Sequence, residues 1–249
     1  MQAYLTLTRR ELGSFFYSWI GYVVIAGAMF GTGWSFVVLL DKLQGEPTIM
    51  PLTEIFLGGS FWLILLFSAP VITMRLFALE KFSGTFETLM TTPVSDWQVV
   101  LAKFTGALIF YMLMWLPLLG CVLVLNYFAR GSNLLDPGTL GSAYLGIFLI
   151  GCLYMAAGCF ASALTRSQIV AAMIGFAIGL AFFLAGFMAG PLDTHQGWAA
   201  QALNCVSVMN QMKDFARGVV DTRSIIFCLT TSLFFLFLAC QVIESRRWR

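Results

Sequence analysis

Charged residues are scarce in this sequence and histidine is almost absent. Only 10% of the 249 residues are Asp, Glu, Lys or Arg, one residue is histidine, and hydrophobic residues make up 59%. A water-soluble domain of this length could not bury so much apolar surface. The composition therefore indicates one integral membrane domain over residues 1–249. The formal net charge is only +2, whereas nucleic-acid-binding domains are strongly basic. We therefore expect no nucleic-acid partner.

Long apolar runs occupy most of the chain, and a helix needs about 20 apolar residues to cross a bilayer. We expect spans at about 17–40, 55–74, 104–128, 140–164, 169–190 and 224–243. The expected fold class is an all-α integral membrane protein with six transmembrane helices. The first run is long enough to span, and no clear small-residue cleavage site follows it. We therefore do not expect a cleavable signal peptide at the N-terminus.

Ionisable residues are missing from all six apolar runs, which contain no Asp, Glu, Lys, Arg or His. Proton relays and voltage sensors place such groups inside membrane helices, so both classes are disfavoured. A TVGYG-like selectivity filter is also absent from the sequence. The sequence has 6 cysteines and no CxxC pair. We expect them to pack as small apolar side chains and to form no metal site.

The motifs of nucleotide binding and hydrolysis are missing as well. No lysine stands in a GxxxxGK[ST] loop, which cradles phosphates with backbone amides and a lysine. The chain is therefore not expected to be an enzyme, and any ATP that drives it must bind to another subunit. An intramembrane hydrolase is the remaining alternative from the enzyme class. Its candidates are weak, because His195 is a lone histidine and Ser60 follows only Gly58-Gly59.

The placement of Lys and Arg predicts the orientation of the spans. The side of both termini carries nine basic residues: Arg9, Arg10, Arg75, Lys81, Lys103, Arg166, Arg246, Arg247 and Arg249. The other side carries five: Lys42, Arg130, Lys213, Arg217 and Arg223. By the positive-inside rule, both termini are expected in the cytoplasm. Residues 191–223 are then an extracytoplasmic or re-entrant segment.

Residues 1–16 are expected to form an interfacial helix at the cytoplasmic surface. At 100° per residue Leu5, Leu12 and Phe16 fall on one stripe, together with Trp19, while Arg10 and Glu11 point away from it. A helix with this pattern can lie in the plane of the membrane before the chain turns into it. A disordered tail is the alternative.

The cytoplasmic stretch over about 75–103 mixes charges with apolar residues at helical spacing. Phe82, Phe86 and Leu89 are spaced by four and then three residues, which places them on one stripe of a helix. Glu80, Lys81 and Glu87 lie largely off that stripe. Pro93 breaks the pattern, and Ser95 is a plausible N-cap for the helix that enters the third span. We interpret the segment as a helix–turn–helix at the inner membrane surface. A plain amphipathic surface loop is the alternative.

Several motifs in this order resemble one transporter family. The segment with Arg75, Glu80, Gly84-Thr85, Glu87, Leu89, Thr92-Pro93 and Lys103 is similar to the signature of ABC-2 type transporter permeases. The turn from Thr165 to Ala171 resembles that family's connection between its fourth and fifth spans. The stretches 215–223 and 244–248 resemble its gliding-motility permease (GldF-like) branch.

The resemblance implies an ABC-2, or type V exporter-like, fold with an N-terminal interfacial helix, six spans and a cytoplasmic coupling helix. Two permeases pair in this family, and cytosolic ATPases dock beneath them. The implied function is that of a permease subunit for export or flipping of an unknown substrate. The alternative is a non-transporting scaffold or mechanotransmission subunit of the same fold. The implied location is the bacterial cytoplasmic (inner) membrane, which the chain would cross several times.

The same resemblance implies which residues and partners matter. The predicted coupling and ATPase-contact residues are Glu80, Lys81, Phe82, Gly84, Thr85, Phe86, Glu87, Leu89, Thr92 and Pro93. This chain is expected to hold no cofactor, because ATP and Mg would be bound by the partner ATPase. Further partners are membrane lipid and a second permease, either another copy or a homologue. Glycine pairs at 27/31, 175/179 and 186/190 have the spacing of closely packed helices and are candidates for that dimer interface.

Overall fold

The computed structural model describes residues 2–45, 59–85, 95–128, 137–192 and 206–247, and these residues contain helices but no strand. The helices are α1 (Gln2–Phe16), α2 (Trp19–Gly45), α4 (Gly59–Thr73), α5 (Ala78–Ser83), α7 (Asp96–Met114), α8 (Leu116–Phe128), α9 (Pro137–Leu164), α10 (Gln168–Leu192), α12 (Val208–Ala216) and α13 (Thr222–Arg247). Six stretches of helix are long and apolar enough to cross a membrane. The predicted all-α fold with six spans is confirmed.

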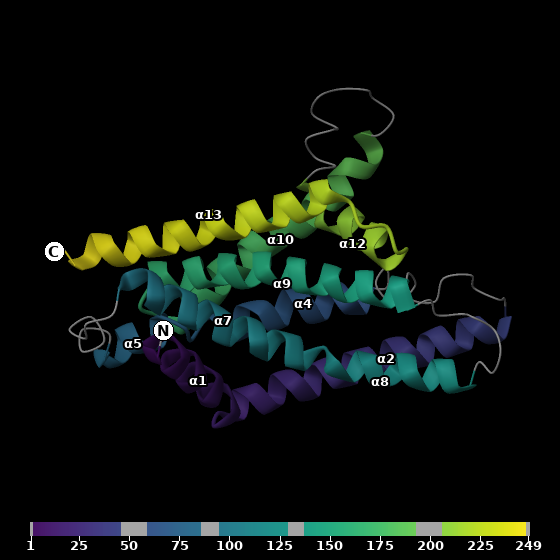
Figure 1. Ribbon diagram of the computed structural model, residues 1–249, viewed down its shortest axis with the longest axis horizontal. Helices are drawn as coiled ribbons and strands as arrows, with labels where there is room; N and C mark the ends of the chain where they lie inside the picture. The colour runs from purple at the N-terminus through teal and green to yellow at the C-terminus, as the bar shows by residue number, and fades with distance from the viewer. Residues whose placement is uncertain (1, 46–58, 86–94, 129–136, 193–205, 248–249) are drawn as a thin grey trace.

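The long helices lie side by side as an elongated bundle, and α1 runs obliquely to them at one end (Figure 1). The described beginning of α1, the short helix α5 and the C-terminal end of α13 all lie toward this end. We call it the terminal end. The ends of α2 and α8, the start of α9 and the helix α12 lie toward the opposite end.

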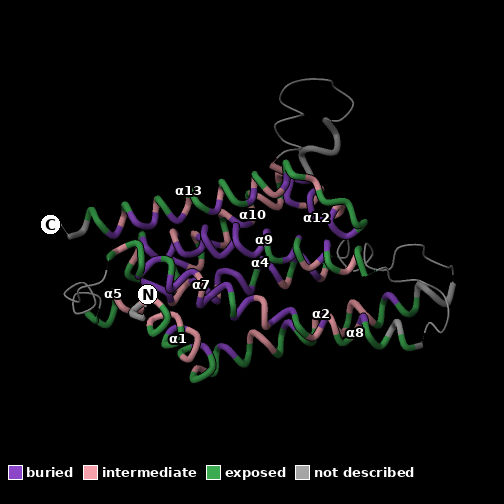
Figure 2. Tube along the Cα trace, in the orientation of Figure 1, coloured by how far each residue is buried: buried purple, intermediate pink, exposed green. Residues whose placement is uncertain are grey.

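Helix α9 forms the centre of the bundle. In its most apolar window 83% of the residues are buried, against 17% for α2. Its neighbours α4, α7, α10, α12 and α13 surround it, and Figure 2 shows the resulting buried band. Helix α2 instead exposes many apolar side chains, including Phe30 and Trp34. For a helix in a bilayer, such a surface faces lipid or another membrane subunit.

The boundaries of the third span differ from those predicted. The helix that carries it starts at Asp96, well before Phe104, so it includes Lys103. Ser95 has the extended backbone of an N-cap residue, as predicted, but its side chain makes no capping hydrogen bond. The helix is interrupted at Trp115, where α7 gives way to α8. Pro117 follows in the first turn of α8, where the missing amide hydrogen costs no hydrogen bond.

The segment between the last two spans contains an ordered helix, α12. The hydroxyl of Ser207 accepts a hydrogen bond from the backbone N–H of Asn210 at 3.2 Å and so caps the N-terminus of α12. At its other end, the hydroxyl of Ser142 donates to the carbonyl of Phe215 at 2.7 Å. This bond ties α12 to α9.

The predicted glycine pairs pack mostly within the chain. A Cβ on Gly31 would lie 2.6 Å from Ile64 of α4, and one on Gly179 would lie 2.9 Å from the Tyr154 ring of α9. A Cβ on Gly186 would lie 2.9 Å from Met209, whereas one on Gly27 would have nothing within 4 Å. Intramolecular packing accounts for Gly31, Gly179 and Gly186, and Gly27 alone of these four has open space beside it.

Candidate functional site

The predicted coupling segment begins in a short helix at the terminal end. Residues 80–82 lie in α5, and Gly84 and Thr85 follow it. The predicted residues Phe86, Glu87, Leu89, Thr92 and Pro93 lie outside the described residues. The first half of the predicted site therefore has a defined position.

Gly84 interrupts the helical run that the sequence predicted through residue 89. Its φ of 74° and ψ of −2° are left-handed and form the C-cap of α5. Glycine favours this conformation because it has no Cβ, and such a residue ends a helix. Helix α5 therefore ends at Gly84, and the stripe through Phe82, Phe86 and Leu89 stays a prediction because its last two members lie outside the described residues.

Ser162 of α9 holds the tight turn that leads into α5. Its hydroxyl accepts hydrogen bonds from the backbone N–H groups of Phe77 at 3.0 Å and Ala78 at 3.1 Å. It also lies 3.2 Å from the Met74 carbonyl, to which it donates. Ser162 is fully buried. One hydroxyl thus fixes the connection between α4 and α5 against the centre of the bundle.

Lys81 points into the protein, although the sequence placed it among the charges of a partner-facing helix. Only 8% of the residue is exposed, and its ammonium donates to the carbonyl of Ala163 near the end of α9. This contact supplies a donor to one of the last carbonyls of α9, which have no partner within their own helix. Lys81 therefore anchors α5 to α9, and the prediction of a surface contact is corrected.

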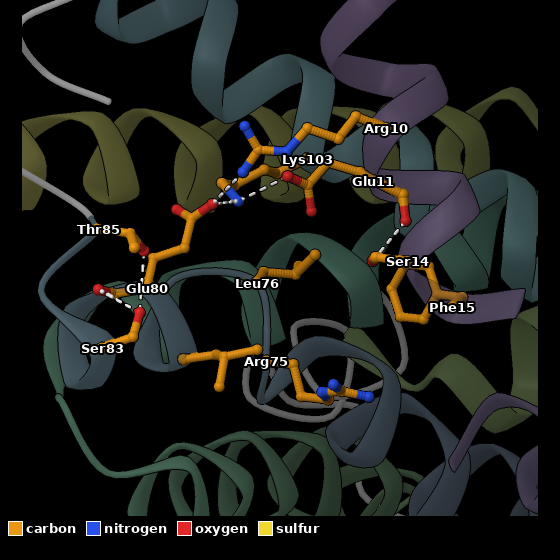
Figure 3. A pocket seen from close by; sticks show the side chains of 11 residues that line it. Arg10, Glu11, Ser14, Phe15, Arg75, Leu76, Glu80, Ser83, Thr85 and Lys103 are labelled. Atoms are coloured by element: carbon orange, nitrogen blue, oxygen red, sulfur yellow. Dashed lines mark hydrogen bonds and ion pairs between the residues drawn. The ribbon is translucent and has the colours of Figure 1, made fainter. Parts of the chain in front are cut away.

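Glu80 lies in a buried charge network with residues from two other helices, which Figure 3 shows. The ammonium of Lys103 on α7 lies 2.9 Å from an oxygen of Glu80 and 2.9 Å from an oxygen of Glu11 on α1. The Arg10 guanidinium lies 3.3 Å from the same Glu80 oxygen. Lys103 also lies 5.4 Å from the centre of the Phe77 ring. We call Glu11, Glu80 and Lys103 the charge triad.

The charge triad is shielded from water to different degrees. The side chain of Lys103 is 3% exposed, that of Glu11 is 11% exposed and that of Glu80 is 12% exposed, whereas Arg10 is 62% exposed. The attraction between the three buried charges is consequently screened less than the Arg10 contact. The triad joins α1, α5 and α7 at the terminal end.

A cavity of about 230 Å³, lined by both polar and apolar side chains, adjoins the charge triad. Figure 3 shows its lining side chains, among them Arg10 and Ser14 of α1 and Arg75 from the turn before α5. The second oxygen of Glu80 is buried and has no hydrogen-bond partner among the described residues. A buried polar oxygen in such a place favours an approaching hydrogen-bond donor.

Phe82 lies on the outer side of α5 and is 78% exposed. Beside it the hydroxyls of Ser83 and Thr85 lie 2.9 Å apart. Helix α5 thus has an outer side with an exposed aromatic ring and an inner side held by Ser162, Lys81 and Glu80.

Sequence reasoning assigned no role to Glu11 and placed Lys103 only within a motif. The helical stripe put Glu11 away from the membrane-facing residues, and that is where it lies. It contacts α7, however, and is only 9% exposed. The available signal was a pair of charges. Glu11 stands in an amphipathic helix, and Lys103 stands at the start of a later span without a neighbouring acidic residue in the sequence. Nothing in the sequence specified that the two meet.

The fold defines a multi-pass membrane protein with a short helix, α5, anchored at one end of its bundle. Residues 38–217, more than half of the chain, match the family described as ABC-2 family transporter protein. The chain belongs to the ABC-2 transporter family, whose members are transmembrane permease subunits that normally work with an ABC ATPase. No curated protein matches the sequence.

Proposed function

We propose that this chain couples ATP hydrolysis by a separate cytosolic ABC ATPase to the export or flipping of a substrate. The observation that carries the proposal is the attachment of α5. This helix exposes Phe82 on one side and is held on the other by Ser162 and the charge triad. A coupling element must be stiff, because a flexible one would dissipate the displacement imposed by the ATPase.

The ATPase docks on the segment from Leu79 to Thr92 in this proposal. Among the described residues, Phe82 is the proposed anchor. Its large exposed aromatic ring lies away from the membrane core and offers an apolar contact for a groove on the ATPase. Gly84 and Thr85 belong to the same contact surface. The sequence prediction adds further contact residues beyond them: Phe86, Glu87, Leu89, Thr92 and Pro93. Glu80 and Lys81 act from the inner side by positioning α5.

Displacement of α5 would then reach four helices of the bundle. The turn held by Ser162 leads to α4 and α9, and the charge triad leads to α1 and α7. Packed elements transmit displacement because protein interiors are dense and resist compression. Movement at the docking site therefore changes the relative positions of membrane helices.

The remaining parts of the proposal concern assembly and location. Both termini and α5 lie on the cytoplasmic side of a bacterial inner membrane, as the distribution of Lys and Arg favours. The permease works as a pair, with a second copy or a homologue, and ATP and Mg are bound by the ATPase. Within the family, the motifs near residues 215–223 favour the gliding-motility permease branch.

The test is a pull-down of ABC ATPase subunits from the same cells with membranes that contain Phe82→Ala. We expect loss of most of the recovered ATPase and of its stimulated ATP turnover, with unchanged permease in the membrane. Phe30→Ala is the matched control, because Phe30 is 76% exposed on α2 against 78% for Phe82. Full recovery and normal turnover with Phe82→Ala would place docking elsewhere. Intact docking without any substrate-stimulated turnover would favour the scaffold function.

A further inference from the structure

We propose that α2 and α4 form a binding site for one anionic phospholipid, with an acyl chain in an apolar groove and the phosphate at Arg75. The apolar groove is separate from the outer side of α5, whereas Arg75 also lines the cavity beside the charge triad. Its assignment to the cytoplasmic leaflet rests on the proposed orientation, whereas the binding itself does not.

The groove between α2 and α4 is open to the surroundings of the bundle and has a volume of about 360 Å³. Its lining residues are Val23, Val24, Gly27, Ala28, Leu63, Ile64, Phe67, Ser68 and Val71. Ser68 is the only hydroxyl among them, and it is 3.5 Å from the Leu65 carbonyl of its own helix. The surface offered to a ligand is therefore hydrocarbon.

The absence of a side chain at Gly27 keeps the groove open. A Cβ there would have no heavy atom within 4 Å, although Gly31, one turn along the same helix, packs closely on Ile64. The groove extends over about 7.5 Å of helix rise from Val23 to Ala28 and about 12 Å from Leu63 to Val71. These dimensions suit a stretch of acyl chain lying along the helices.

One end of the groove lies toward the terminal end of the bundle, and Arg75 lies just beyond it. Its guanidinium donates to the hydroxyl of Ser18, five residues before Val23. The rise of a helix over that interval is about 7.5 Å. The positive charge consequently lies just past the apolar lining, where the phosphate of a lipid with its chain in the groove would be.

Arg75 has charge available for such a phosphate. Among the described residues its hydrogen bond goes to the neutral Ser18, and no carboxylate lies within ion-pair distance of it. A guanidinium offers several donors in a planar fork that matches phosphate oxygens. Exposed Tyr17, Trp19 and Tyr22 lie around the same level, and aromatic side chains of this kind favour the headgroup region of a bilayer.

The combination of groove and charge selects a phospholipid over a second copy of the chain. Another permease could cover the apolar lining but would not by that contact alone supply an anion for Arg75. A phospholipid satisfies both features at once, because its acyl chain and phosphate are joined at about the separation described. A free phosphate lacks the acyl chain, and in a zwitterionic lipid the cation of the headgroup itself offsets the phosphate charge that Arg75 would bind.

The test is native mass spectrometry of the purified full chain with added lipids. Phosphatidylglycerol is compared with phosphatidylcholine of identical acyl chains, and glycerol 3-phosphate is the probe without chains. Wild-type protein should retain phosphatidylglycerol most strongly. Arg75→Gln should lower that retention about fivefold, the effect of one basic side chain near an anionic headgroup. Arg9→Gln is the matched control, because Arg9 is exposed at the same end and lines neither cavity.

Gly27→Leu, which fills the groove, should lower retention of both phospholipids, and Gly27→Ala should do so less. Equal losses with Arg75→Gln and Arg9→Gln would overturn the site, because surface charge alone would then explain the preference. Unchanged lipid retention with Gly27→Leu, together with loss of the dimer, would assign the groove to a second copy instead. Recovery of ATPase in the pull-down is measured on the same variants, so that failure of lipid binding is distinguished from failure of docking.

Discussion

The ammonium of Lys103 and a carboxylate oxygen of Glu80 lie 2.9 Å apart, and this contact joins α7 to the inner side of α5. The same ammonium lies 2.9 Å from Glu11 of α1. One lysine at the beginning of a membrane span therefore holds two peripheral helices. The contact explains how an element as short as α5 keeps a fixed position.

Replacing Lys103 with methionine should destabilise the protein strongly. The change leaves the buried Glu11 without its counter-charge and Glu80 with only the exposed Arg10. Removing one partner from a buried ion pair typically costs about 3–5 kcal/mol. Arg10→Gln breaks only the exposed contact to Glu80 and should cost about 1 kcal/mol or less. Thermal unfolding in a mild detergent measures both effects. Equal midpoints for the two variants would contradict the central role of Lys103.

Combining Lys103→Met with Glu11→Gln and Glu80→Gln should restore much of the lost stability. The uncompensated charges are then gone, while the packing of α1, α5 and α7 remains. If the triple variant unfolds as readily as Lys103→Met alone, loss of packing rather than unpaired charge explains the effect. The comparison isolates the electrostatic part of the contact.

Ser162→Ala should loosen the turn before α5. It leaves the backbone N–H groups of Phe77 and Ala78 without their acceptor, and each unsatisfied buried donor costs about 1–3 kcal/mol. Ser83→Ala is the control, since Ser83 is exposed. Hydrogen exchange of the peptide containing residues 74–80 should rise in Ser162→Ala only. If this peptide exchanges in Ser162→Ala as slowly as in the wild-type protein, Ser162 is not the anchor of the turn.

The two glycines Gly158 and Gly27 should respond oppositely to alanine. A Cβ on Gly158 would lie 2.1 Å from the Thr73 hydroxyl oxygen, so Gly158→Ala forces α4 and α9 apart. Overpacking of this kind costs about 1–3 kcal/mol. Gly27→Ala meets nothing within 4 Å and should be neutral or slightly stabilising, because alanine favours helix. Unfolding midpoints of the purified variants measure the difference.

The orientation of the spans is open to direct labelling. In a background without the native cysteines, single cysteines at Asp41, Asp136 and His195 should react with an impermeant reagent added outside the cell. A cysteine at Ser83 should react only after the membrane is opened, because α5 is proposed to be cytoplasmic. Reaction of the first three from the cytoplasmic side alone would reverse the topology. A labelled cysteine at Asp221, just before α13, provides a further point on the outer side.

The number of spans and the class of the protein followed from the sequence alone. Hydrophobicity is a property of each segment by itself, and a run of about 20 apolar residues must become a helix to satisfy its backbone in lipid. The six predicted spans accordingly fall on six membrane-length stretches of helix, although the third begins earlier than predicted, at Asp96. The start of α7 after Ser95 was also predictable, because capping is a local preference.

The partners of the charges were decided only by the tertiary structure. The sequence offered Glu80 its neighbours Arg75 and Lys81, but Glu80 contacts Lys103 and Arg10, which come from α7 and α1. Lys81 turns instead toward Ala163. These choices depend on how each helix is rotated and how closely it approaches the next. Several packed helices set that rotation together, so no local sequence pattern contains it.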